Sequence, residues 1–145
     1  MSKYESKELQ QLYETEMADQ SPFARGRRLF FDDDFEQARQ CFIQAVNEDH
    51  AEAMTYLGYM YRKGLGVCRN DAKAAALYQQ AIDTGGDTLL TSTAYNNLGV
   101  LYMKGEGVAQ NLAKARQLFL QAIDIDGSED AKHHLKELSF LHKIN

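Results

Sequence analysis

Apolar residues recur every three or four positions along most of the chain, which is the spacing of helices that bury one face. The pattern is clear in residues 53–61 and again in residues 74–82. Between these segments lie Gly64 and Gly66, and glycine tolerates the left-handed backbone that ends many helices. Asn70 then provides a side chain suited to begin the next helix. The pattern predicts a helical hairpin with a glycine loop.

This hairpin occurs twice. Residues 53–83 align without a gap to residues 94–124, and 17 of the 31 aligned positions are identical. Self-similarity at a fixed period is the signature of repeat architectures. Gly58 and Gly99 stand at equivalent positions, where the lack of a side chain lets a neighbouring helix approach closely. We expect the hairpins to stack, each burying its apolar face on its neighbours.

A shorter hairpin precedes the two glycine-loop units. It spans residues 21–50, and the turn Asp32–Asp34 replaces the glycine loop. We expect Asp34 and Gln37 to form a capping box at the start of its second helix. Arg25 stands where the later hairpins carry leucine.

Both ends of the chain read as capping helices, which repeat proteins need for solubility. The domain is expected to divide into residues 1–20 as a first cap, hairpins at 21–50, 51–86 and 87–127, and residues 128–145 as a second cap. The apolar residues expected to face the stack are Leu9, Leu12, Tyr13, Met17, Ala131, Leu135, Leu138 and Leu141.

The segment from Gly85 to Thr93 lengthens the third hairpin by about five residues. Two interpretations are open. Either the first helix of this hairpin starts early, with Leu89 and Leu90 packed, or an apolar loop stands out for a partner. We favour packing, because apolar side chains gain free energy when they leave water.

The motif Ala-x-x-x-Leu-Gly-x-x-Tyr-x-x-Gly-x-Gly-Val, followed by Lys-Ala-x-x-Leu-Tyr-x-x-Ala, resembles the Sel-like repeat (SLR) family. That family is related to the tetratricopeptide repeats and has a longer glycine loop. The resemblance covers Ala51–Gly86 and Ser92–Gly127, about half the chain. It implies an all-α fold, a short right-handed solenoid of stacked helical hairpins with capping helices at both ends. It also implies that the concave face, or the edge of the superhelix, binds proteins.

Charge narrows the classes of partner. The net charge is −5, and residues 1–50 hold 6 basic and 11 acidic side chains. This excess argues against nucleic acid and anionic membranes, both of which need a basic surface. No apolar run suggests a signal peptide or a membrane span. Cys41 and Cys68 make no pair by spacing, so we expect a reduced, cytoplasmic location.

We expect no enzyme activity, no cofactor and no metal. No serine or cysteine nucleophile has a base placed beside it by spacing. His133 and His134 are adjacent, so they point about 100° apart on a helix and cannot share a metal ion. The recurring glycine loops follow helices, whereas a phosphate-binding loop follows a strand. We expect no small-molecule substrate either.

The partner is expected to be another protein or peptide, bound by the first helix of each hairpin. The protein would act as an adaptor or would neutralise a toxin or effector; the alternative is a chaperone or assembly factor for extended apolar segments. Aromatic, methionine and arginine side chains are enriched at such interfaces. By analogy with tetratricopeptide hairpins, the predicted binding residues are Phe23, Arg27, Phe30, Glu52, Thr55, Tyr59, Arg62, Asn96, Val100 and Met103.

Overall fold

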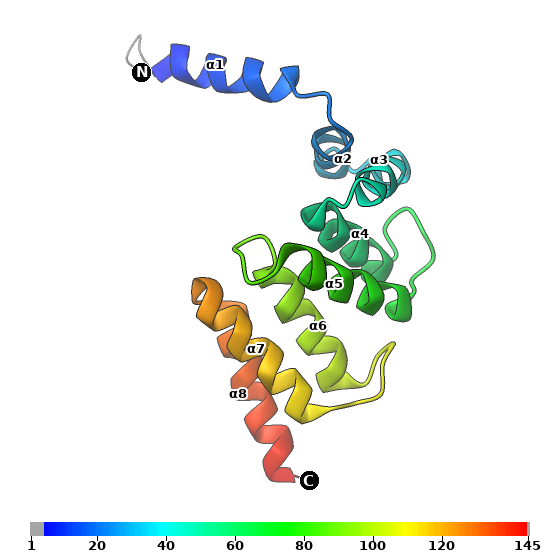
Figure 1. Cartoon of the computed structure of the whole chain (residues 1–145), viewed down its shortest axis with the longest axis vertical. Helices are drawn as coiled ribbons and strands as arrows, with labels where there is room; N and C mark the ends of the chain where they lie inside the picture. Colours follow the sequence, from blue (N-terminus) through cyan, green and yellow to red (C-terminus); the bar gives the residue numbers. More distant parts are fainter. Residues whose placement is uncertain (1–4, 145) are drawn as a thin grey trace.

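A computed structural model describes residues 5–144 as a row of helices, with no strand in that range (Figure 1). The side chains of Glu5, Glu16, Met17, His142 and Ile144 are outside the described part, so the packing expected of Met17 is outside it too. The helices are α1 (Glu5–Ala18), α2 (Pro22–Phe31), α3 (Phe35–Asn47), α4 (Ala51–Lys63), α5 (Asp71–Gly85), α6 (Ser92–Lys104), α7 (Leu112–Asp126) and α8 (Glu129–Ile144). The predicted all-α fold is confirmed.

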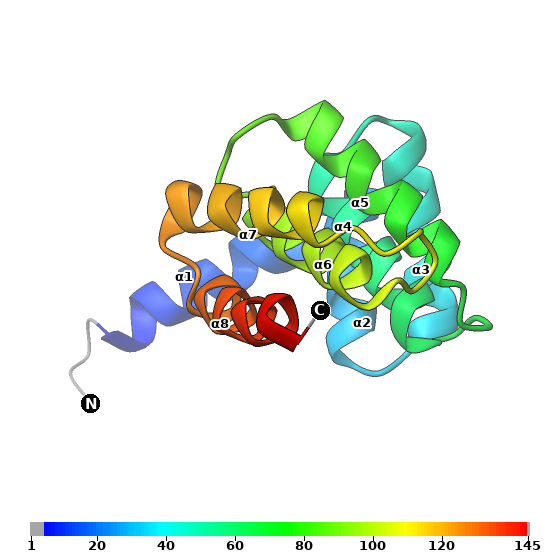
Figure 2. The ribbon, with the colours of Figure 1, turned by 90° about the horizontal axis from the view of Figure 1, so that it is seen from below.

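Consecutive helices form three hairpins, α2–α3, α4–α5 and α6–α7, and each hairpin packs on the next. Figure 2 shows α5 and α7 along one side of the stack, with α2 and α8 along the other. Apolar clusters join the hairpins: Phe42 of α3 packs in one cluster with Met60 of α4, and Tyr78 of α5 packs in another with Leu98 of α6. The core therefore runs along the stack, as in a solenoid.

The two glycine loops end their helices as predicted. Gly64 and Gly105 have φ of 70° and 67°, in the left-handed region, and their N–H groups donate to carbonyls in the last turn. Asn70 and Asn111 accept hydrogen bonds from backbone N–H groups three residues on, at 3.0 Å each. Each loop therefore begins with a glycine in the left-handed conformation and ends with an asparagine that caps the next helix.

The second glycine of each loop has a different role. A Cβ on Gly66 would lie 2.7 Å from the backbone of Phe35, and one on Gly107 would lie 2.3 Å from the backbone of Asp71. Phe35 and Asp71 begin the second helices of the preceding hairpins. Each loop therefore packs directly against the backbone of the previous repeat, and this contact leaves no space for a side chain.

The capping box predicted at α3 forms only in part. The Asp34 carboxylate accepts a hydrogen bond from the backbone N–H of Gln37 at 3.4 Å. The backbone N–H of Asp34 donates to the carbonyl of Leu29 at 2.9 Å, so it is not left for the Gln37 side chain. The last turn of α2 supplies that acceptor.

The inserted segment is an exposed loop, so the predicted packing of Leu89 and Leu90 is wrong. Their side chains are 71% and 53% exposed, and α6 begins only at Ser92. The buried Thr91 hydroxyl lies 2.6 Å from the carbonyl oxygen of Gly86 and accepts from the N–H of Thr88. These polar contacts close the turn on itself and leave the two leucines outside.

The two terminal helices behave differently. α8 packs against α7 and α6, with Ala131 and Leu138 buried, as expected of a cap. α1 stands apart at the other end of the stack (Figure 1), and Leu9, Leu12 and Tyr13 are all exposed. The expectation that this face packs on the first hairpin is therefore wrong.

Candidate protein-binding surface

The predicted binding residues occupy three equivalent positions on the first helices of the hairpins, α2, α4 and α6. We call the surface that these helices share the first-helix face. The equivalent sets are Phe23, Thr55 and Asn96; Arg27, Tyr59 and Val100; and Phe30, Arg62 and Met103. Glu52 lies one turn before Thr55 and is half-buried.

On α6 this face is covered by α8. Met103 is 1% exposed and Asn96 is 7% exposed, and Val100 is half-buried in one apolar cluster with Met103 and Leu138 of α8. The prediction that Asn96, Val100 and Met103 form an open groove is therefore corrected. α8 takes the place of the first helix of a further hairpin, and it needs an apolar surface to pack on.

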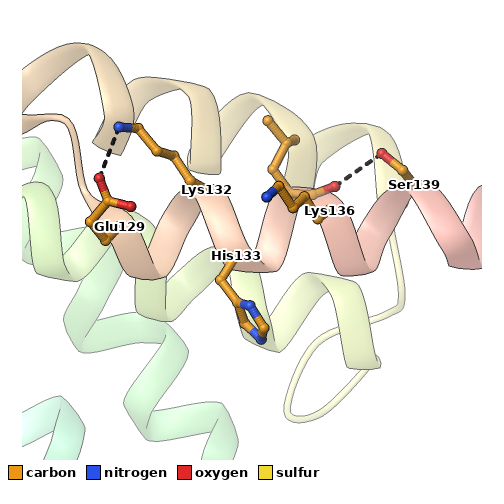
Figure 3. A pocket seen from close by; sticks show the side chains of 6 residues that line it. Glu129, Lys132, His133, Lys136 and Ser139 are labelled. Carbon is orange, nitrogen blue, oxygen red and sulfur yellow. Dashed lines mark hydrogen bonds and ion pairs between the residues drawn. The ribbon is translucent and has the colours of Figure 1, made fainter.

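His134 of α8 completes this contact. Its Nδ1 lies 2.9 Å from Asn96 Oδ1, and its ring stacks on Phe119 with centroids 5.4 Å apart. Burial lowers the pKa of His134, since the charged ring would lose water. His133 instead lines a shallow hollow on α8 together with Glu129, Lys132 and Lys136 (Figure 3). All the lining residues of this hollow come from one helix.

On α4, Thr55 and Arg62 are also engaged by their own chain. Thr55 is 8% exposed. The Arg62 guanidinium lies 3.0 Å from Asp71 of α5 and also contacts Glu106, in the glycine loop of the next hairpin. Arg69 contacts the same two carboxylates at 2.9 Å each. The expectation of Thr55 and Arg62 as open groove residues is corrected, because one is buried and the other ties two repeats together.

The network also sets the protonation of its carboxylates. Hydrogen bonds from Arg69, and then from Arg62, hold the pKa of Asp71 below its usual range. The hydrogen bond from Arg62 holds the pKa of Glu106 below its usual range. Both carboxylates are therefore charged at neutral pH, and the network is complete there.

The part of the first-helix face that stays partly exposed is an aromatic cluster across α2 and α4. Tyr56 is its centre: its ring lies 5.8 Å from Phe23, 5.3 Å from Phe30 and 5.1 Å from Phe42. The ring of Tyr59 lies 6.3 Å from that of Phe30, and its side chain is 38% exposed. The structure thus brings Phe23, Phe30 and Tyr59 together, as expected for one surface. We call Phe23, Phe30, Tyr56 and Tyr59 the aromatic surface.

Cations border the aromatic surface. The Arg27 guanidinium lies 5.8 Å from the Phe23 ring centroid, and the Lys63 ammonium lies 5.9 Å from that of Tyr59. Burial, and then the nearby Glu52 carboxylate, raises the pKa of Tyr56, so its hydroxyl stays protonated at neutral pH. The surface offers π faces, two cations and a phenol, which is the chemistry of interface anchors.

Sequence reasoning missed Tyr56. It precedes the motif leucine Leu57, and the equivalent residue of the next hairpin is Asn97, so the repeat gives no apolar signal there. Tyr56 also lines, with Arg27, a groove that continues along α2 to Arg28 and Phe31 and to Tyr13 of α1. An aromatic residue at a variable position, beside two phenylalanines on the preceding helix, was the available signal.

The residues that the structure describes also bear on a metal site, a membrane span and a disulfide. Within the described residues, no group of three or more His, Cys, Asp or Glu side chains could hold a metal ion. The described helices are too short or too polar for any of them to cross a membrane. Cys68 is exposed and Cys41 is half-buried, and neither is in a disulfide.

Comparison with known proteins identifies the repeats. A family model described as Sel1 repeat matches residues 32–50, 51–85 and 92–126, more than half of the chain. No curated protein matches the chain.

Two solved structures are similar. A Sel1 repeat protein from Oxalobacter formigenes is 28% identical, with a TM-score of 0.70 over 80% of this chain. The protein c5321, a protective antigen of uropathogenic Escherichia coli with an SLR fold, is 26% identical, with a TM-score of 0.73 over 92% of this chain. The chain spans 45% and 29% of those two proteins, respectively.

Proposed function

The chain belongs to the Sel1 repeat family, and from this we propose that it is a non-catalytic binding module that holds one partner protein on its aromatic surface. Sel1 repeat proteins generally mediate protein–protein interactions and generally lack enzyme activity. The observation that carries the proposal is the aromatic surface on α2 and α4, in which Tyr59 is exposed and Phe23, Phe30 and Tyr56 are half-buried. The equivalent positions on α6 are covered by α8, so they offer no such surface.

The specific role that we propose is that of an adaptor, or of a protein that neutralises a toxin or effector by covering it. A folded partner suits the aromatic surface, because the rings of that surface are held against each other and against Phe42 in fixed orientations. Rigid aromatic anchors favour a partner of one defined shape, since little side-chain entropy is lost on binding. A chaperone for extended apolar segments is the alternative, and it would use a more adaptable surface.

Tyr59→Ala tests this proposal. Tyr59 is exposed and outside the apolar core clusters, so the variant should keep the helicity and melting temperature of the wild type. Affinity for the partner should fall at least about tenfold, or about 1.4 kcal/mol, as is typical for a central aromatic anchor. Phe140→Ala is the matched control, because Phe140 is an exposed aromatic residue on α8, outside the aromatic surface.

The partner is found by affinity capture from the natural source, with mass spectrometry, on wild-type and variant baits in parallel. One stoichiometric protein that is retained by Phe140→Ala and lost by Tyr59→Ala supports the proposal. Many unfolded proteins in place of one would favour the chaperone. Undiminished capture by a folded Tyr59→Ala bait would move the interface elsewhere.

A further inference from the structure

The N-terminal end of the stack is open. In the two later hairpins, the motif leucines Leu57 and Leu98 are buried, because the preceding hairpin packs over them. The equivalent residue in the first hairpin is Arg25, which is exposed. At the far end α8 covers α6 and α7, so within residues 5–144 a helix caps the stack at this end alone.

Helix α1 has the apolar face of a cap but does not cover this end. Leu9, Leu12 and Tyr13 lie on one side of the helix and are 58%, 62% and 65% exposed. The link to α2 is fixed by hydrogen bonds to Asp19: its carboxylate accepts from the N–H of Ser21, and its carbonyl accepts from Arg28. These bonds fix Asp19 against the start of α2, and α1 lies beyond it in the extended position seen in Figure 1.

The charges of the two helices are complementary. α1 carries four glutamates and one lysine, whereas α2 carries three arginines and no acidic residue. Arg25 and Arg28 line the groove between α1 and α2, next to Phe31, which is 70% exposed. Asp19 and Asp32 also line this groove, so its three arginines leave it with a small net positive charge. A helix that is acidic, with an exposed leucine face, fits a groove of net positive charge with an exposed phenylalanine.

We propose that α1 of a second copy of this chain packs in the groove along α2, and that the exchange is reciprocal. Each copy carries both the acidic apolar helix and the basic groove, so one two-fold axis satisfies both and closes the assembly. The exchange buries both leucine faces and puts Arg25 opposite the glutamates of the partner's helix. The groove adjoins the aromatic surface, because Tyr56 and Arg27 line it, but Tyr59 is not among its lining residues. Tyr59→Ala therefore tests the proposed function separately from the dimer.

The first test measures mass by light scattering and sedimentation at chain concentrations up to about 100 µM, a range that detects weak dimers. The wild type should be a dimer. Leu12→Lys should be a folded monomer, because the lysine places a charge in the apolar contact and adds to the positive charge of the groove. Leu89→Lys is the matched control: Leu89 is an equally exposed leucine in the α5–α6 loop, and this variant should remain dimeric.

A charge exchange distinguishes a reciprocal dimer from other arrangements. Glu8→Lys makes α1 more basic, and Arg25→Glu makes the groove more acidic. Each variant alone should dimerise at least about tenfold more weakly than the wild type, because the pair is repeated across the two-fold axis. An equimolar mixture of the two variants should form a one-to-one heterodimer. One of its two contacts between α1 and the groove pairs the introduced lysine with the introduced glutamate, and the other is the wild-type contact.

Three results would overturn the proposal. A wild type that is monomeric over this concentration range would mean that α1 has no second copy as its occupant. A dimer that persists in Leu12→Lys would place the interface on another surface. Single charge variants that lose thermal stability as monomers, with recovery only when both changes are in one chain, would show that α1 packs on its own α2.

Discussion

The hairpins α4–α5 and α6–α7 have almost the same backbone but different side chains on the first-helix face. The N-cap residues of their second helices, Asn70 and Asn111, have identical φ and ψ of −148° and 96°, and their glycine caps agree within 3° in φ. Yet Arg62 of one is replaced by Met103 in the other. The repeat motif fixes the hairpin, and the remaining positions are free to differ.

The residue type at these remaining positions matches the element that lies over each hairpin. α8 lies over α6, so methionine and valine at this face are buried in an apolar cluster. At α4 the same face meets the glycine loop of the next hairpin, where Glu106 pairs with Arg62. Glu106 is itself the equivalent of Leu65, which packs partly buried against the first hairpin. The glycine loop thus adds an apolar contact at one junction and ion pairs at the next, beside the apolar clusters that join the hairpins at both.

Exchanging the residues that differ tests this contrast most strongly. Met103→Arg should lower the free energy of unfolding by about 3 kcal/mol or more, because a charge would be buried under α8 without a partner. The reverse change, Arg62→Met, should cost only about 1 kcal/mol, since its ion pairs are partly exposed. Denaturant unfolding of both variants measures the two values.

Met103→Leu is the control for the first change, because it keeps an apolar side chain of similar volume and should cost less than about 1.5 kcal/mol. If Met103→Arg were as mild as Arg62→Met, α8 would not cover α6 in solution, and Met103 would return to the list of open groove residues.

The shared part of the two hairpins is tested at the glycine caps. Gly64→Val and Gly105→Val should each destabilise the fold by about 1–3 kcal/mol, because a β-branched residue is strained at positive φ. The two costs should be similar, since the two caps have the same geometry. Ala76→Val, at an exposed position within α5, controls for the poor helix propensity of valine. Unchanged melting temperatures in both glycine variants would contradict the left-handed caps.

The sequence was sufficient for whatever depends on the repeat itself. The hairpins, the left-handed glycine caps and the asparagine N-caps follow from local conformational preferences, which act within a few residues. The burial and the contacts of Arg62, Met103 and Tyr56 could not be predicted in the same way, because they depend on which helix or loop of another repeat lies opposite. Residue type suggested binding for Arg62 and Met103 and missed Tyr56, whereas packing places only Tyr56 in the aromatic surface.

The predictions for α1 and for the inserted segment were wrong for a related reason. An apolar helix face indicates that something covers it, but not which element does so: α8 is covered by its own chain, whereas Leu12 of α1 is exposed. In the insertion, the polar contacts of Thr91 close the turn, and these outweigh the apolar character of Leu89 and Leu90. Contacts made by a single hydroxyl leave no periodic signal in the sequence.

The smallest expected effect is the pH dependence of the ion-pair junction. The folded state lowers the pKa of Asp71 and of Glu106, so the network contributes stability above their ordinary values of 3.8 and 4.5 and loses it as pH falls through the lowered values. The difference in unfolding free energy between wild type and Arg62→Met should therefore be largest at neutral pH, up to about 1 kcal/mol, and should shrink toward about pH 3. Taking the difference between the two proteins cancels the contribution of the other carboxylates to the pH dependence, because they titrate alike in both. The Met103→Leu control should show a constant difference over the same range, since no carboxylate ion pair is changed. A wild-type minus Arg62→Met difference that is independent of pH would mean that Arg62 stabilises the junction by packing its methylene groups rather than by pairing with Asp71 and Glu106.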